Sequence, residues 1–138
     1  MSTETANIGA FLEGLRSAVE DAGLRAGLGV KPDTTAGQPW ALISLMSTVF
    51  DGDIEAYNSN VDVLVQVRSV GYSVQQAHAA YWRADAAVMA FETFDNGVVT
   101  FRTREALTAP TRDDATFPDR PVYYVDATYR AWPAPAGA

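Results

Sequence analysis

A chain of 138 residues is long enough for one domain with a hydrophobic core, and a hydrophobic share of 48% excludes an intrinsically disordered protein. The net charge of −7 argues against a general nucleic-acid binder, because such proteins neutralise phosphates with a basic surface. The chain contains no cysteine, which excludes disulfides and thiolate metal sites.

The first element predicted along the chain is an amphipathic helix from about residue 6 to 26. Its apolar stripe, at helical spacing, consists of Ile8, Phe11, Leu12, Leu15, Val19 and Ala22. The glycines between Gly23 and Gly29 are then expected to end the helix. The region lacks the basic start and apolar run of a signal peptide, and no stretch approaches the ~20 apolar residues of a membrane span. We therefore expect a soluble protein that is made in the cytoplasm.

Two strands are expected next, on either side of an acidic turn. Residues 40–50 form a nearly continuous apolar run, WALISLMSTVF, which predicts a buried strand. Residues 61–71 alternate valine with other residues, which is typical of a half-buried strand. The acids between them, Asp51, Asp53 and Glu55, are spaced like the start of a calcium loop, but its glycine and distal glutamate are missing. We interpret them as a solvated turn.

A second helix is predicted from Ser73 to about residue 92. Ser73 is a typical N-cap residue, and Gln76 three positions later completes a capping box. The face that we expect to pack on the sheet consists of Ala77, Ala80, Tyr81, Ala84, Val88 and Phe91.

Two more strands are expected in the C-terminal third. The turn signal Asp95-Asn96-Gly97 precedes a strand whose alternation places Val99 and Phe101 on one face and Arg102 and Arg104 on the other. Residues 108–121 contain three prolines and many charges, and predict an exposed loop.

The last strand is expected to alternate through Tyr123, Val125, Ala127 and Tyr129. We expect residues 132–138 to form a flexible C-terminal tail, because their prolines cannot donate to a sheet. The order of elements then predicts a single α+β domain over residues 1–138, with an antiparallel or mixed four-stranded sheet and two helices packed on one face.

No residue pattern predicts catalysis. His78 is the single histidine, and its neighbours offer neither a nucleophile nor companion metal ligands. The glycines of residues 23–29 end a helix, whereas a phosphate-binding loop begins one. We therefore predict no enzyme, no catalytic residue, no metal and no cofactor.

Charged loops and arginine-bearing strands are the better candidates for function, because tyrosine and arginine favour buried contact surfaces between proteins. Nine of the ten basic residues are arginine. The candidate interface residues are Asp51, Asp53 and Glu55 in one loop, Arg102 and Arg104 on a strand, and Arg112, Asp113 and Asp114 in a second loop.

Residues 61–91, VDVLVQVRSVGYSVQQAHAAYWRADAAVMAF, resemble the central segment of tail terminator (tail completion) proteins of long-tailed bacteriophages, especially those infecting actinobacteria. The matching residues are Val65, Gln66, Val67, Ser69, Val70, Gly71, Gln76, Ala77, Ala84 and Asp85. Residues 120–136 also resemble the last strand of that family, so the likeness covers about half of the chain. Tyr81-Trp82-Arg83 departs from the smaller or charged residues that relatives more often have there.

The resemblance implies a structural virion protein. Its subunits would form a ring, commonly a hexamer, that caps the head-proximal end of the tail tube, stops tube polymerisation and joins the tail to the head connector. DNA would pass through the lumen without specific binding, and an acidic wall would keep it from adhering. Two alternatives stay open: another head–tail connector or neck protein, and a small-ligand-binding α+β domain.

Overall fold

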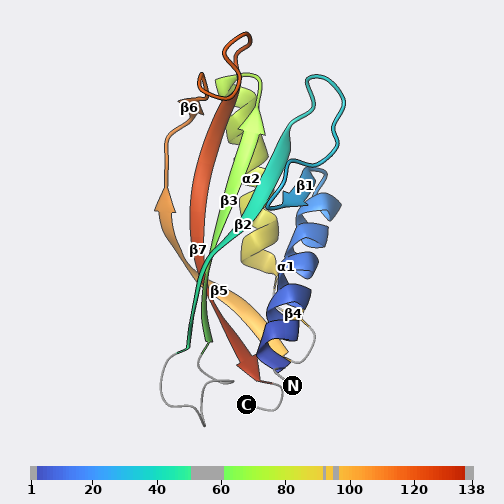
Figure 1. Cartoon of the computed structure of the whole chain (residues 1–138), viewed down its shortest axis with the longest axis vertical. Helices are drawn as coiled ribbons and strands as arrows, with labels where there is room; N and C mark the ends of the chain where they lie inside the picture. Colours follow the sequence, from blue (N-terminus) through green and yellow to red (C-terminus); the bar gives the residue numbers. More distant parts are fainter. Residues whose placement is uncertain (1–2, 51–60, 92, 95–96, 136–138) are drawn as a thin grey trace.

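The computed structural model describes residues 3–50, 61–91, 93–94 and 97–135 (Figure 1). In these ranges the chain forms two helices and a mixed sheet of seven strands, so the α+β class is confirmed. The elements are α1 (Thr3–Asp21), β1 (Arg25–Leu28), β2 (Trp40–Phe50), β3 (Val61–Gly71), α2 (Val74–Ala90), β4 (Thr93–Phe94), β5 (Gly97–Leu107), β6 (Thr111–Arg112) and β7 (Tyr123–Pro135).

The sheet contains the four expected strands, β2, β3, β5 and β7, and three short strands that the sequence patterns do not predict. Its order is β1-β2-β3-β7-β5-β4, and β6 pairs with β7. The β1–β2 pair is parallel and all the other pairs are antiparallel. Figure 1 shows that β7, the last strand in sequence, lies between β3 and β5.

The first helix is shorter than predicted, because it ends at Asp21 and not near residue 26. Gly23 follows with φ 94°, a left-handed conformation that glycine adopts without steric cost and that stops a helix. Residues 25–28 then pair with residues 40–43 as a parallel strand. That pairing joins segments that are distant in the sequence, and no local periodicity predicts it.

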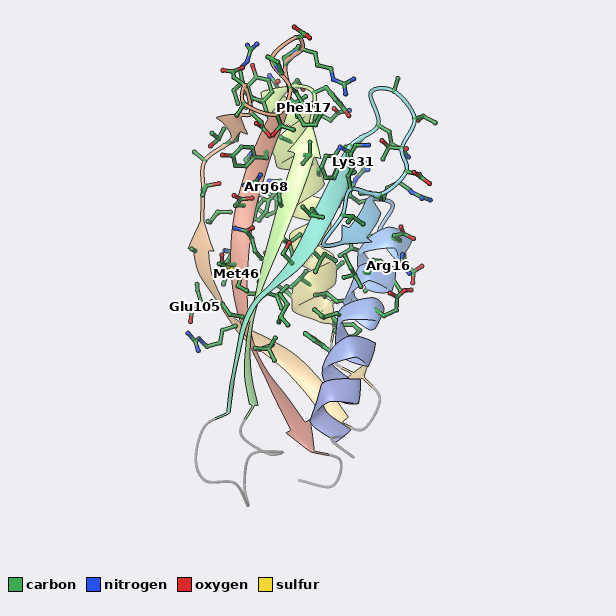
Figure 2. All side chains as sticks on the ribbon, in the orientation of Figure 1. Arg16, Lys31, Met46, Arg68, Glu105 and Phe117 are labelled. Atoms are coloured by element: carbon green, nitrogen blue, oxygen red, sulfur yellow. The ribbon has the colours of Figure 1, made fainter. Side chains whose placement is uncertain are left out.

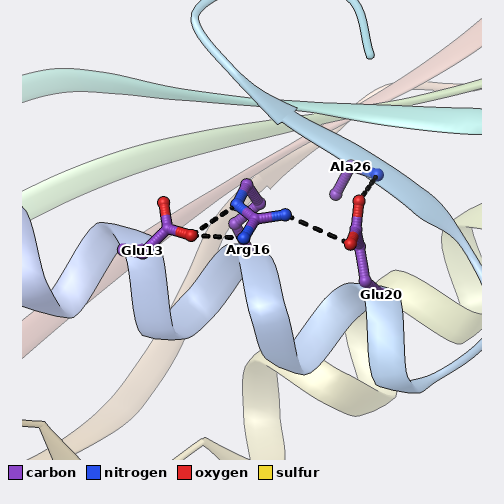
Figure 3. A network of polar contacts seen from close by, with 4 residues as sticks. All are labelled: Glu13, Arg16, Glu20 and Ala26. Carbon is purple, nitrogen blue, oxygen red and sulfur yellow. Dashed lines mark hydrogen bonds and ion pairs between the residues drawn. The ribbon is translucent and has the colours of Figure 1, made fainter. Parts of the chain in front are cut away.

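A polar network ties the end of α1 to β1 (Figure 3). Arg16 bonds to Glu13 one turn earlier and lies 3.1 Å from Glu20 one turn later. The other carboxylate oxygen of Glu20 accepts a 3.2 Å hydrogen bond from the backbone N–H of Ala26. The helix surface therefore fixes the position of the first strand.

The main core lies between the helices and one face of the sheet. From the helices it contains Phe11, Leu15 and Val19 of α1 and Ala77, Ala80, Tyr81, Ala84 and Val88 of α2. From the sheet it contains mainly the alternating residues of the central strands, Val63, Val65, Val67, Val125, Ala127, Tyr129 and Ala131. The predicted apolar faces of α2, β3 and β7 are confirmed, and both helices pack on the same face. Ala22 of the predicted α1 stripe is exposed, because the helix has already ended there.

The start of α2 follows the predicted capping pattern. Ser73 has an extended backbone, and its hydroxyl accepts a 3.0 Å hydrogen bond from the N–H of Gln76. The side chain of Gln76 reaches back and accepts a 2.7 Å hydrogen bond from the N–H of Tyr72. Because two otherwise unpaired donors are satisfied, the helix begins at a defined residue.

The last strand is longer than predicted, since β7 continues through Trp132 to Pro135. Pro133 and Pro135 pair with Val99 and Gly97 of β5, whereas the pairing of β7 with β3 ends at Ala131. Beyond that point one side of β7 has no strand partner in the described chain. A missing proline N–H is tolerated on such a side, so the tail predicted from residue 132 is instead strand up to residue 135.

Neither of the two described helices covers the opposite face of the sheet. At one end of that face, a second cluster of Trp40, Val70 and Val122 is packed against Phe117 of the long loop before β7. Figure 2 shows Phe117 at the end of the strands and Arg68 further along the same face. The described ranges therefore form a two-layer structure with one largely open sheet face.

Candidate assembly surfaces

The predicted interface residues fall into three groups. Asp51, Asp53 and Glu55 lie outside the described residues, and so does the side chain of Arg102. Arg104 lies near the middle of β5, and Arg112, Asp113 and Asp114 lie in and after β6. The structure thus keeps the charged loop together and places Arg104 apart from it.

Arg104 takes part in a polar contact between the sheet and α2. Its Nη1 atom lies 2.9 Å from Oδ1 of Asp85, and the Asp85 side chain is only 13% exposed. The hydroxyl of Tyr129 donates a 2.7 Å hydrogen bond to the same oxygen. Burial and the neighbouring carboxylate raise the pKa of Tyr129 well above its ordinary value of 10.0. Arg104 is therefore engaged inside the subunit.

The face predicted for Arg104 is wrong. Simple alternation places Phe101 and Arg104 on opposite faces, yet they pair with Ala131 and Tyr129, two buried residues of β7. Register shifts on both sides of Thr103 and Arg104 break the period of two. Each β-bulge adds one residue to a strand and exchanges the faces of the residues that follow.

The second charged loop is exposed and holds local contacts. Nε of Arg112 lies 2.5 Å from Oδ1 of Asp114, and both side chains are largely solvent-accessible. A carboxylate oxygen of Asp113 accepts a 3.0 Å hydrogen bond from the N–H of Thr116. Exposed ion pairs contribute little to stability, so these groups remain available for contacts with another protein.

The side of α2 that faces away from the core is unusually apolar. We call it the α2 outer face, and it consists of the exposed residues Val74, Gln75, His78, Ala79, Trp82, Arg83, Ala86, Met89 and Ala90. Arg83 is the one charged residue among these nine. Trp82 is 61% exposed, which is unusual for the largest apolar side chain. The outer face resembles a contact surface more than a solvated one.

Aromatic rings and a shallow pocket extend this face toward β5. The ring of His78 lies 5.9 Å from the ring of Trp82 and 6.2 Å from that of Tyr81. A pocket of about 230 Å³ beside them is lined by His78, Tyr81 and the segment from Leu107 to Pro110. Leu107 is itself 48% exposed. Trp82 is not among the interface residues predicted from the sequence. Its exposure could have been expected, because it lies outside the predicted core face of α2.

The open sheet face carries paired charges. Arg68 makes two hydrogen bonds of 2.8 and 2.9 Å to the carboxylate of Asp126, which raise the pKa of Arg68. The guanidinium carbon of Arg68 also lies 4.0 Å from the ring centroid of Tyr124. Such a planar two-bond pair is rigid, so this part of the face has a fixed shape.

A second pocket, of about 240 Å³, lies at the end of the open face. Its lining includes the rings of Trp40, Phe117 and Tyr124 together with Lys31 and Arg68. The Nζ atom of Lys31 lies 5.4 Å from the ring centroid of Trp40. The indole N–H of Trp40 is buried and has no acceptor among the described residues.

In the described ranges, no three His, Asp or Glu side chains lie together as possible metal ligands. Neither of the two helices there combines the length and the apolar character that crossing a membrane requires. Comparison of the chain with models of known protein families and with curated proteins gives no match.

Proposed function

We propose that the chain is the tail terminator of a long-tailed bacteriophage. Its subunits form a ring, a hexamer by the family resemblance, that caps the head-proximal end of the tail tube. The ring stops polymerisation of the tube protein and joins the tail to the head connector. It acts at the head–tail junction of the virion after assembly in the host cytoplasm, and it works by binding neighbours and not by catalysis.

The observation that carries this proposal is the α2 outer face. A monomeric protein in water rarely leaves a tryptophan and a methionine on one helix face together with alanines. Tryptophan is the residue type that most often dominates the free energy of protein association. The face therefore fits a subunit whose surface is covered by other proteins in its working state.

The resemblance of residues 61–91 and 120–136 to tail terminators supports the specific role. It coincides with β3, α2 and β7, which form the centre of the domain. A connector or neck protein of the same virion is the nearest alternative. Its position in a virion reconstruction distinguishes the two, because a terminator contacts the tube protein directly.

The pocket beside Trp40 favours a different class of function, the binding of a small ligand. Its volume of about 240 Å³ lies below the roughly 300–1,000 Å³ of most ligand sites. The described lining residues also lack the convergent nucleophile and base that catalysis requires. We therefore keep ligand binding as the second candidate.

The test is assembly of purified tail tube protein with and without this chain. We expect the chain to limit tube growth in electron micrographs and to sediment with the tubes. The variant Trp82→Glu, which places a charge on the α2 outer face, should lose this effect. Ser17→Glu is the matched control, because Ser17 is an exposed residue of α1 away from that face. Tubes that grow and sediment as if the chain were not there contradict the proposal.

A further inference from the structure

At each of its two edges, the sheet has a long strand whose outer side is largely unpaired in the described chain. On one side β1 covers β2 only over residues 40–43, so residues 44–50 have no partner beyond β3. On the other side β4 covers β5 only over residues 97–98, so residues 99–107 have no partner beyond β7. Unpaired backbone N–H and C=O groups along such an edge are a template for another strand.

The two unpaired edges lie at the same level of the sheet. Ser44 on β2 pairs with Gln66, Gln66 pairs with Thr128, and Thr128 pairs with Ala106 on β5. The register therefore connects one edge to the other along a single row. Two copies placed side by side bring these edges together without sliding along the strands.

The directions of the two edges also match. Because each of the pairs β2–β3, β3–β7 and β7–β5 is antiparallel, β2 and β5 run in opposite directions. Rotation about an axis along the strands leaves these directions unchanged. We infer that β5 of one copy pairs antiparallel with β2 of the next and that this contact, repeated around the axis, closes the ring. The inference rests on the proposed function, since it specifies how the ring forms.

The positions of the β-bulges indicate which residues of each edge strand pair with the neighbouring copy. Bulges and charges usually prevent uncontrolled pairing of edge strands, and register shifts flank Met46 on β2 and both Arg102 and Glu105 on β5. Between these shifts and the far ends of the unpaired edges, residues 47–50 (STVF) and 99–101 (VTF) have regular register and no charge. Valine, threonine and phenylalanine favour strands, so these segments are the regular core of the contact.

The same arrangement brings the next copy beside the α2 outer face. Within one copy, α1 contacts β1, α2 and β4, whereas His78 of the α2 outer face lines a pocket with Leu107 of β5. Pairing along β5 places the next copy beside this pocket.

Engineered disulfides test the pairing, and each is unambiguous because the chain has no cysteine. Facing residues of antiparallel strands have Cα atoms within the range of a disulfide. After oxidation, the double variant Ser44→Cys with Ala106→Cys should form disulfide-linked oligomers. On a non-reducing gel these give a ladder of bands, and the largest band corresponds to the number of subunits in the ring. Met46→Cys in place of Ser44→Cys samples a register moved by two residues. Ser17→Cys with Ala106→Cys is the control and should give no ladder.

A charge on either edge provides a second readout. Thr48→Lys and Thr100→Lys should each reduce the mass measured by light scattering from ring to monomer, because an edge lysine blocks strand pairing. The control Ser17→Lys should leave the ring intact. Rings that persist in both edge variants, together with no ladder from either cysteine pair, overturn the inference.

The outcomes separate this inference from the proposed function. A ring that limits tube growth but resists both edge tests refutes the strand pairing and leaves the terminator role in place. A cross-linked ring that does not affect tube growth refutes the terminator role and supports the pairing. A chain that stays monomeric with and without tube protein refutes both.

Discussion

The hydroxyl of Tyr129 in β7 donates a 2.7 Å hydrogen bond to the carboxylate of Asp85 in α2. Tyr129 is fully buried, so its hydroxyl needs a partner inside the protein. Asp85 is largely buried and has Arg104 of β5 at 2.9 Å on the same oxygen. The three side chains thus join two strands and a helix at one point in the layer between them.

Removing this hydroxyl should destabilise the domain. In Tyr129→Phe the carboxylate of Asp85 keeps Arg104 but loses a donor, and hydrogen bonds to charged groups contribute roughly 1.5–3 kcal/mol. Urea unfolding measures the change in free energy. Tyr124→Phe is the control, since its ring lies on the open sheet face, and we expect a change within about 0.5 kcal/mol. Equal stability of the two variants would show that the bond contributes nothing.

The same contact predicts how stability depends on alkaline pH. Burial and Asp85 raise the pKa of Tyr129 in the folded protein, whereas the unfolded chain has the ordinary value of 10.0. Above that pH the unfolded state releases a proton that the folded state retains, so stability falls as pH rises. Burial also raises the pKa of Tyr81, so Tyr129→Phe should weaken this fall without removing it. Urea midpoints measured on both sides of the ordinary tyrosine pKa check the slope.

Two glycines should respond to alanine in opposite ways. A Cβ at Gly71 would lie 2.4 Å from the backbone nitrogen of Ala77, so Gly71→Ala must push α2 away and should cost at least about 1–3 kcal/mol. Gly9 lies on α1, and a Cβ added there would have no neighbouring atom of the described chain within 4 Å. Gly9→Ala should therefore stabilise the helix by about 0.5–1 kcal/mol. Thermal unfolding of the two variants tests whether the signs differ.

The cap of α2 is a third point of sensitivity. Ser73→Ala removes the acceptor for the N–H of Gln76 and should cost about 1 kcal/mol. Ser17 is an exposed residue inside α1, so Ser17→Ala should be neutral or slightly stabilising. A Ser73→Ala variant as stable as the parent protein in urea would contradict this account of where the helix begins.

Local sequence patterns are sufficient to predict that the long elements exist and whether each is a helix or a strand, but not where every one of them ends. The valine alternation of β3 and the Ser73–Gln76 pair each depend on neighbours in the chain, and both are confirmed. The short strands have no such signal. Residues 25–28 form β1 because β2 is available beside them, and only the folded sheet supplies that partner.

The candidate sites show the same division. Arg112 and Asp114 are near in sequence and form a pair, as their proximity suggests. Arg104 is recognisable as a charged strand residue, but its contact with Asp85 depends on the bulge between Phe101 and Thr103, which no local pattern reveals. Arg68 and Asp126 meet because β3 and β7 are neighbours in the sheet, and that register is a property of the whole fold.

The position of β7 also constrains the order of events during synthesis. A nascent chain that has emerged as far as residue 121 already contains β3 and β5, but the strand that belongs between them has not yet left the ribosome. The two halves of the sheet therefore cannot join until residues 123–135 have emerged. Until then the inner edges of β3 and β5 lack their partner strand and are open to pairing with other chains.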